Sequence, residues 1–292
     1  MHWSYGSGAV AGEPERFDGQ APCFDRRAGL PAGAARAVAR VVLETAAPGP
    51  DDVLVELGAG TGEIGQHLIE SIRYVGIDRS ETMLELFREK LASADNARVR
   101  LSRTDANRLW PVGDESAAVV FASRVAHLFD AEHLVAELQP VCRSRGHFLV
   151  GRVIRDPGGV KSRLRRQRGL VLRQHGVAPR DADEATERAV GELVARGAAR
   201  IKARSVAAWT ASASVREILA ACDVVGAMGG KQLGAATRAR VLTEVESWAA
   251  SEMGDLDEVA SWGEQYALEG VRMADPPRST IGSRVKGCSP RN

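Results

Sequence analysis

The sequence VLVELGAGTG at residues 53–62 decides the fold. Its first five residues form an apolar run that is typical of a buried strand. The glycines that follow let the backbone turn sharply and approach a ligand closely. A helical pattern of apolar residues comes next, at Ile64, Leu68 and Ile69. A strand, a glycine-rich turn and a helix in this order indicate a ligand-binding βα unit.

Short apolar runs alternate with helical patterns along the next hundred residues. Five of these runs predict strands, at residues 52–57, 74–78, 99–101, 117–122 and 147–153. Strands that alternate with helices indicate βαβ units and therefore an α/β fold with a parallel sheet. Ligands of such sheets bind beyond the carboxyl ends of the strands, so we expect the functional site at that edge.

The spacing of the glycines and acids distinguishes between nucleotide ligands. A dinucleotide favours G-x-G-x-x-G, whereas this loop is G-x-G-x-G and has Glu63 in place of the third glycine. Glu56, just before the loop, repels a pyrophosphate but suits a cationic ligand. Asp78 ends the second strand, where an acid binds ribose hydroxyls, and Asp105 can accept a bond from an adenine amino group. Together these acids favour S-adenosylmethionine (SAM).

The same residues form four ordered motifs that resemble those of the class I SAM-dependent methyltransferases. They are ELGAGTG at 56–62, VGID at 75–78, TDA at 104–106 and VVFASR at 119–124. The resemblance covers roughly residues 24–155. It implies a Rossmann-like, seven-stranded, mostly parallel sheet with helices on both faces. It also implies that SAM is the cofactor and that the protein is an enzyme, a transferase.

The resemblance further assigns residues to the cofactor. The first acid and the glycines hold the methionine part, and the second acid holds the ribose. The implied set is Glu56, Gly58, Ala59, Gly60, Gly62, Asp78, Arg79, Met83, Asp105, Ala106 and Ser123. The segment FDRR at 24–27 resembles the lid of many small-molecule members, with Phe24 in place of the usual tyrosine.

The 292 residues exceed what this core requires. Residues 1–22 and 275–292 are rich in Gly, Ser and Pro and predict a flexible arm and tail. Residues 23–274 are expected to form the methyltransferase domain, with its sixth and seventh strands at 201–209 and 266–273. Two helical additions are expected over the substrate side, because each emerges at the carboxyl edge. They are residues 156–199 and 212–262.

His127, just beyond the fourth strand, is the candidate general base, although a histidine there could equally cap or pack a helix. Arg124 and Arg152 follow strands and could hold a substrate carboxylate or form salt bridges. Phe24 and Trp209 are further candidates for substrate contact, and Trp209 could instead close a core seam. Because no Asp and Asn cluster follows the fourth and fifth strands, we expect no metal.

The charge pattern leaves the partner of one segment open. A net charge of +1 gives no general reason to expect nucleic acid or a membrane. The Arg-rich stretch at 155–173 could be a solvated helix face, an anion-binding surface or an RNA track. It lacks interleaved aromatic residues, and ASRV at 122–125 differs from the motif of amino-directed nucleic-acid enzymes. We therefore do not expect nucleic acid to be the partner.

Four scattered cysteines and the absence of an apolar N-terminal or membrane-spanning run predict a cytoplasmic protein. The sequence favours methyl transfer to O, N or C of a small organic acceptor by in-line displacement. Two alternatives stay open: an RNA or protein methyltransferase that uses residues 155–173, and a SAM-binding protein that transfers no methyl group. The acceptor, the pathway and the oligomeric state are not set by these patterns.

Overall fold

Seven strands form one central sheet in a computed structural model that describes residues 29–91, 96–178, 184–224, 227–228 and 231–275. The strands are β1 (Val53–Leu57), β2 (Arg73–Asp78), β3 (Val99–Arg103), β4 (Ala117–Ser123), β5 (Cys142–Arg155), β6 (Ala199–Ser214) and β9 (Val259–Arg272). Their order is β3-β2-β1-β4-β5-β9-β6. Only β9 runs antiparallel to its neighbours, so the predicted fold is confirmed.

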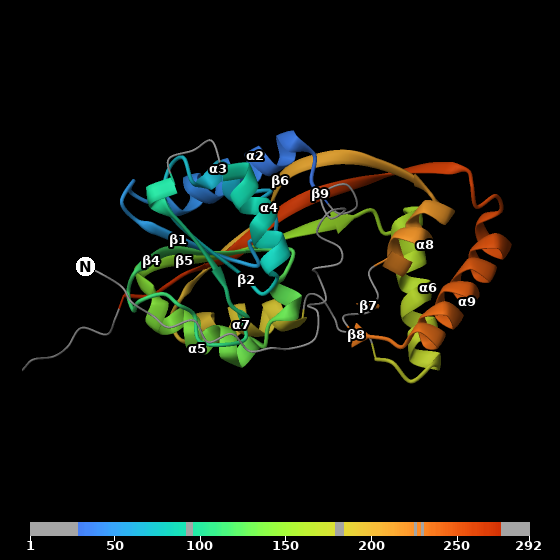
Figure 1. Cartoon of the computed structure of the whole chain (residues 1–292). Coiled ribbons are helices and arrows are strands. Elements are labelled where there is room, and N and C mark those ends of the chain that lie inside the picture. The colour runs from blue at the N-terminus through green and yellow to red at the C-terminus, as the bar shows by residue number, and fades with distance from the viewer. Residues whose placement is uncertain (1–28, 92–95, 179–183, 225–226, 229–230, 276–292) are drawn as a thin grey trace, which may run out of the picture.

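Helices cover both faces of this sheet (Figure 1). One face carries α2 (Ala32–Ala46), α3 (Gly65–Leu68) and α4 (Glu81–Leu91), and the other carries α5 (Ala131–Val141) and α7 (Glu184–Ala195). Short 3₁₀ turns lie at Asn96–Arg98 and Ala126–Leu128. Residues 1–28 and 276–292 lie outside the described residues. They include Phe24, the rest of the FDRR segment, and nearly all of the expected arm and tail.

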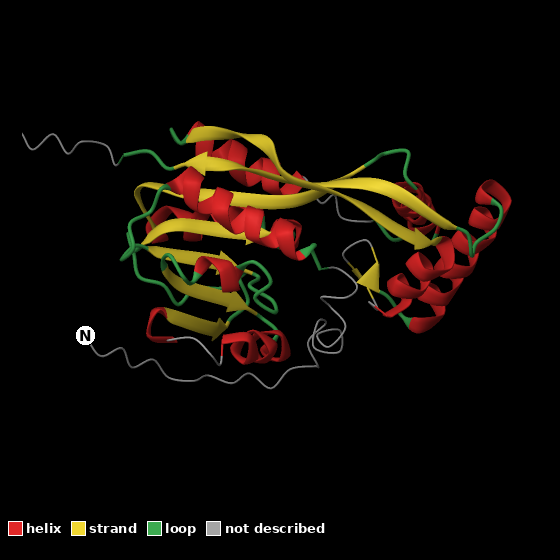
Figure 2. Ribbon diagram, turned by 90° about the horizontal axis from the view of Figure 1, so that it is seen from above, coloured by secondary structure: helices red, strands yellow, loops and turns green. Residues whose placement is uncertain are grey.

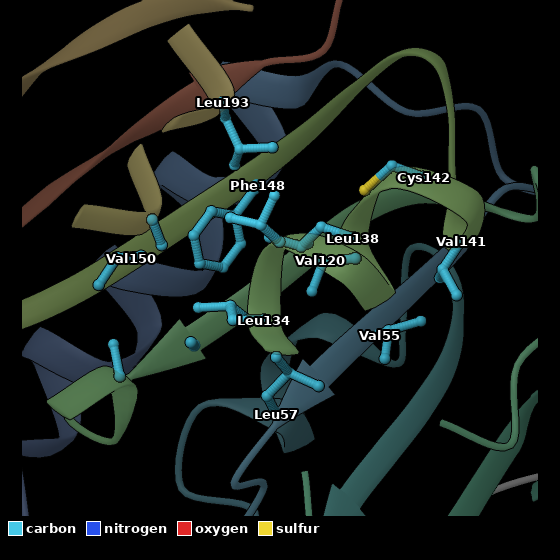
Figure 3. Close-up of a cluster of buried hydrophobic side chains, with 14 of the residues drawn as sticks. Val55, Leu57, Val120, Leu134, Leu138, Val141, Cys142, Phe148, Val150 and Leu193 are labelled. Carbon is cyan, nitrogen blue, oxygen red and sulfur yellow. The ribbon is translucent and has the colours of Figure 1, made fainter. Parts of the chain in front are cut away.

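The core below the sheet shows why α5 and α7 belong to one layer. Leu134 and Leu138, one helical turn apart on α5, pack against Val120 and Phe148 of the sheet (Figure 3). Leu193 of α7 joins the same cluster. Residues 184–195, expected as part of the addition at 156–199, therefore lie in the helical layer of the core.

A second group of helices stands beyond the carboxyl ends of the parallel strands (Figures 1 and 2). This helical body consists of α6 (Val160–Gln174), α8 (Val215–Val224) and α9 (Ala235–Met253). The short strands β7 (Ala227–Met228) and β8 (Lys231–Gln232) pair beside it. Its own hydrophobic core is made by Leu164, Val171, Leu172, Val215, Leu219, Val241, Val245 and Ala249. In Figure 1, α6 and α8 lie nearer to the sheet than α9 does.

Three long strands connect the helical body to the sheet (Figure 2). Pairing of β6 with β9 continues from Ala199↔Arg272 to Ser214↔Val259, and β5 pairs with β9 as far as Arg155↔Glu264. Both β6 and β9 are longer than the strands expected at 201–209 and 266–273. Their outer ends are rich in Ala and Ser and have little apolar alternation, so only the pairing itself defines them as strands. The addition expected at 212–262 is thus helical only between these strand ends.

None of the helices in the described part of the chain combines the length and hydropathy that crossing a bilayer requires.

The contact between β5 and β9 is too close for a side chain at Gly270. A Cβ atom there would lie 2.0 Å from the carbonyl oxygen of Phe148 on β5. We expect Gly270→Ala to lower the free energy of unfolding by about 2–3 kcal/mol, because the two strands must separate.

Gly191 supplies the matched control, since it lies in α7 with no heavy atom within 4 Å of an added Cβ. Gly191→Ala should raise stability by up to about 1 kcal/mol through helix propensity. Urea denaturation checks both values, and an unchanged stability of Gly270→Ala would contradict the close packing.

Candidate functional site

The glycine loop after β1 reaches the carboxyl edge in a backbone conformation that side chains rarely adopt. Gly58, Gly60 and Gly62 have φ of 69°, 55° and 74°. A Cβ atom added to Gly58 would lie 2.8 Å from the side chain of Val125, and one added to Gly62 would lie 2.0 Å from the ring of Phe87. At Gly60 the nearest heavy atom would be 4.0 Å away, so this glycine faces open space. Packing and a positive φ thus explain two of the glycines, whereas at Gly60 the positive φ favours glycine and the open space leaves room for a ligand.

Asp78, at the end of β2, is held by two backbone amides. The amide of Gly60 donates to its Oδ2 at 2.8 Å, and the amide of Ser80 donates to its Oδ1 at 2.9 Å. A carboxylate has about four acceptor positions, so hydroxyl groups of a ribose can be accommodated as well. Its neighbour Arg79 is exposed, and Met83 is buried on α4.

The loop after β3 is tied to the loop after β4 by Asn107. Its side-chain amide donates to the carbonyl of Leu128 at 3.2 Å and accepts from the amide of Asp130 at 2.7 Å. Asp105 accepts from the backbone of Asn107 at 3.0 Å, and Ala106 is buried. The predicted adenine motif thus lies beside the turn that follows the fourth strand. No local pattern in the sequence marks Asn107, because its role depends on two loops meeting.

Glu56 is a buried carboxyl group below the glycine loop, with 3% of its surface exposed. Burial raises its pKa to about 8, against the opposing effects of Tyr74 and Arg124. The hydroxyl of Tyr74 on β2 donates to Oε2 of Glu56 at 2.5 Å. A carboxyl group so buried ionises readily only when a cation lies beside it. This environment therefore suits a positively charged ligand.

Arg124 is paired with Glu63. The two side chains form a salt bridge, and Glu63 also accepts a bond from the amide of Leu30, which lies just before α2. The backbone amide of Arg124 donates to the carbonyl of Gly151 on β5 at 2.7 Å. Glu63 was noticed only for the spacing of the loop, and nothing in the sequence marked it as the partner of Arg124.

Tyr266 of β9 reaches across β5 to the end of β4. Its hydroxyl lies 2.7 Å from Oγ of Ser123, and the side chain is fully buried. Gly151 makes this crossing feasible, because a Cβ there would lie 1.7 Å from the tyrosine oxygen. Burial raises the pKa of Tyr266, so its hydroxyl stays protonated. The sequence analysis missed Tyr266, since its place depends on β9 lying beside β5.

The remaining predicted residues are spread over the edge of the sheet. His127 lies in the 3₁₀ turn just after β4 and is half-buried. Arg152 pairs with Glu269 of β9, with 3.1 Å between Nη2 and Oε1. Trp209 packs against the core beneath α2. Their roles toward a substrate stay predictions, and Phe24 lies outside the described residues.

Among the described residues, no group of three or more His, Cys, Asp and Glu side chains is placed to hold a metal ion.

A family model described as a methyltransferase domain matches residues 54–146. The match spans the glycine loop, Asp78, Asp105 and Ser123, and so coincides with the carboxyl-edge site. The chain contains a class I SAM-dependent methyltransferase domain. SAM is the cofactor of this domain, as the loop and its acids predict. No curated protein matches the chain.

Solved structures share the fold of this methyltransferase domain. The [4+2]-cyclase SpnF is 18% identical with a TM-score of 0.54, over 89% of this chain and 94% of its own. The YcgJ protein from Bacillus subtilis is 16% identical with a TM-score of 0.51, over 80% and 97%. A geranyl diphosphate methyltransferase solved with SAM is 14% identical with a TM-score of 0.49, over 82% and 85%. At these identities the likeness concerns the fold alone.

The carboxyl-edge residues of the methyltransferase domain fit SAM chemically. Gly60 leaves open space, Asp78 is a carboxylate held at the end of β2 by two backbone amides, and Glu56 can face a positive charge. Which atoms of SAM each residue contacts stays a prediction.

The raised pKa of Glu56 predicts a pH dependence of stability. Because the folded state keeps the proton to a higher pH than the unfolded state, stability falls as pH rises from about 4.5 to about 8. Between pH 6 and pH 8 this group alone should remove about 2 kcal/mol from the free energy of unfolding. In Glu56→Gln this contribution to the pH-dependent loss of stability should disappear.

Urea denaturation of the SAM-free protein at the two pH values measures this difference. Glu85→Gln is the matched control, since Glu85 lies exposed on α4, and it should behave like the wild type. Equal pH dependence of Glu56→Gln and the wild type would show that Glu56 ionises normally.

Proposed function

We propose that this protein transfers the methyl group of SAM to O, N or C of a small organic acceptor by in-line displacement. The observation that supports this best is the helical body, which three long strands hold beyond the carboxyl edge. An acceptor placed between the helical body and the loops after β1 and β4 would be near the cofactor site. An added layer of this kind favours an acceptor that is enclosed over one that is a flat macromolecular surface.

The chemistry depends mainly on positioning. SAM supplies a methyl group that is already activated by its sulfonium. Asp78 would hold the ribose and Glu56 the methionine end of the cofactor, and S-adenosylhomocysteine would leave as the methyl group passes to the acceptor. Reacting atoms kept at about 3–3.5 Å convert the transfer into an effectively unimolecular step.

His127 is the proposed general base. It follows β4 directly, where its imidazole can take a proton from a hydroxyl or ammonium acceptor. Ser123 and Tyr266 are buried and hydrogen-bonded to each other, so they are less available for this role.

The cations of α6 argue against an RNA track. Arg163 lies over the ring of Trp248 on α9, whereas Arg166 donates to the carbonyl of Pro157. Arg168 donates to Cys222 on α8. These three side chains are engaged with other groups of the protein, which makes them less available to a phosphate backbone. This distribution supports the small-molecule acceptor.

Asp78→Asn tests the cofactor site. The amide cannot accept from Gly60, Ser80 and a ribose hydroxyl at once, so we expect SAM affinity to fall by about ten- to a hundredfold. Calorimetry with SAM measures this. Asp114→Asn, at an exposed turn, is the control and should bind SAM like the wild type. Normal SAM binding by Asp78→Asn would remove Asp78 from the cofactor site.

His127→Gln tests the base. We expect the rate constant of transfer to fall by about 10²-fold or more, with unchanged SAM affinity, because a positioned base contributes to the chemical step alone. The assay follows label from [methyl-³H]SAM into a panel of small hydroxyl, amine and activated-carbon acceptors.

His133→Gln is the control, because His133 lies on α5 beside the carbonyl of Arg108. An unchanged rate in His127→Gln would exclude the base. SAM binding without transfer to any acceptor of the panel would indicate a cofactor-binding protein that carries out no methylation.

A further inference from the structure

Two cations contact one carboxylate where the long strands meet the helical body, and a third cation lies on the same face of α6. Arg155 ends β5, Lys161 lies in the first turn of α6, and Arg168 lies two turns further along. Among the described residues, Glu264 of β9 is the carboxylate that contacts this group. We call Arg155, Lys161 and Arg168 the junction cations.

One oxygen of Glu264 serves several donors. Its Oε1 accepts from Nε of Arg155 at 2.7 Å and from the indole Nε1 of Trp262 at 3.0 Å. The ammonium of Lys161 is 3.6 Å from the same oxygen, which is beyond a normal hydrogen bond. Lys161 is also 5.7 Å from the centre of the Trp262 ring. Glu264 therefore satisfies Arg155 well and Lys161 only partly.

Burial makes this imbalance of charge costly. The side chain of Lys161 is 38% exposed and that of Arg155 is 28% exposed. Burial, and next the charge of Arg155, lower the pKa of Lys161, whereas Glu264 and Cys222 oppose this shift. A solvated helix face, one alternative for this stretch, would leave Lys161 and Arg168 exposed, whereas both are half-buried.

Arg168 extends the same group toward α8. Its Nη1 is 2.7 Å from Sγ of Cys222, and Cys222 is close enough to act electrostatically on Lys161. Residues seven apart on a helix share one face, so Lys161 and Arg168 lie on the same side of α6. A guanidinium has five N–H donors in a fork that matches a carboxylate or phosphate. The thiol of Cys222 uses only part of that capacity.

The register of the strands gives the distance of this group from the cofactor site. Ser123, the end of β4, lies opposite Gly151, and Arg155 is four residues further along β5. At 3.3 Å per residue, Arg155 stands about 13 Å beyond the carboxyl edge. A molecule whose acceptor atom lies beside β4 would need to be elongated to reach the junction cations.

We propose that the junction cations Arg155, Lys161 and Arg168 bind an oxyanion, a phosphate or a carboxylate, at the far end of an elongated acceptor. This inference rests on the proposed function in one respect, namely that the bound oxyanion is part of the methyl acceptor. The binding site itself is independent of methyl transfer. An oxyanion supplies the negative charge that Glu264 alone does not, and the remaining donors of the cations hold it.

The test uses the full-length protein saturated with S-adenosylhomocysteine. Pyrophosphate and malonate are titrated separately in a calorimeter, at an ionic strength kept constant with sodium chloride. We expect at least one of them to bind. The stronger of the two tells whether the oxyanion is a phosphate or a carboxylate.

The variants Lys161→Met and Arg168→Gln should each weaken this binding by at least about tenfold, because a charge-assisted contact is lost. Lys161→Arg keeps the charge and should bind within a few-fold of the wild type. Arg166→Gln is the matched control, because its guanidinium contacts the carbonyl of Pro157. It should bind like the wild type.

Calorimetry with SAM shows for every variant that the cofactor site is intact. The proposal is overturned if neither anion binds to the SAM-competent wild type, or if Arg166→Gln loses as much affinity as Arg168→Gln. Unchanged binding in both Lys161→Met and Arg168→Gln would also overturn it. Each of these results leaves the proposed methyl transfer standing, whereas absence of transfer leaves the anion titration unaffected.

Discussion

The insertion of β9 between β5 and β6 is the constraint on which the rest of the molecule depends. As the one antiparallel strand, it pairs with both neighbours along most of its length. It brings Tyr266 to Ser123 at the end of β4 and Glu264 to Arg155 beyond the sheet. The close contact at Gly270 shows how tightly this strand is held. One strand therefore links the cofactor edge to the helical body.

Burial of charge is the second organising feature of the site. Glu56 is removed from water, and its carboxyl group resists ionisation until a cation arrives. Arg124 and Glu63 neutralise each other close by, and Glu63 also holds the chain that leads into α2. The site thus carries an electrostatic cost of ionising Glu56, which a positively charged ligand beside it would lower. Such a cost favours affinity for the cofactor over stability of the empty protein.

Local patterns were enough to predict the core of the fold and the elements that carry the cofactor motifs. The glycine loop and Asp78 lie at the ends of strands with a clear apolar run, and Asp105 follows a weaker one, so their common edge could be deduced from chain order. Asn107, Glu63 and Tyr266 could not be found in this way. Each contacts a residue from another element, and those contacts arise only when the strands are placed side by side. The outer ends of β6 and β9 were missed for a related reason, since Ala and Ser carry little strand signal.

The helical body explains why these long strands matter for function. Among the described residues, eight buried side chains form its core, with partly buried side chains around them, and a core of that size stabilises a structure only marginally. The paired ends of β5, β6 and β9 must therefore supply much of its order and set its place relative to the sheet. The junction cations lie at this connection, where the position of α6 is fixed most directly by the strands. The hydrogen-bond register of the paired strands therefore fixes the distance between the junction cations, the proposed substrate-binding group, and the cofactor edge.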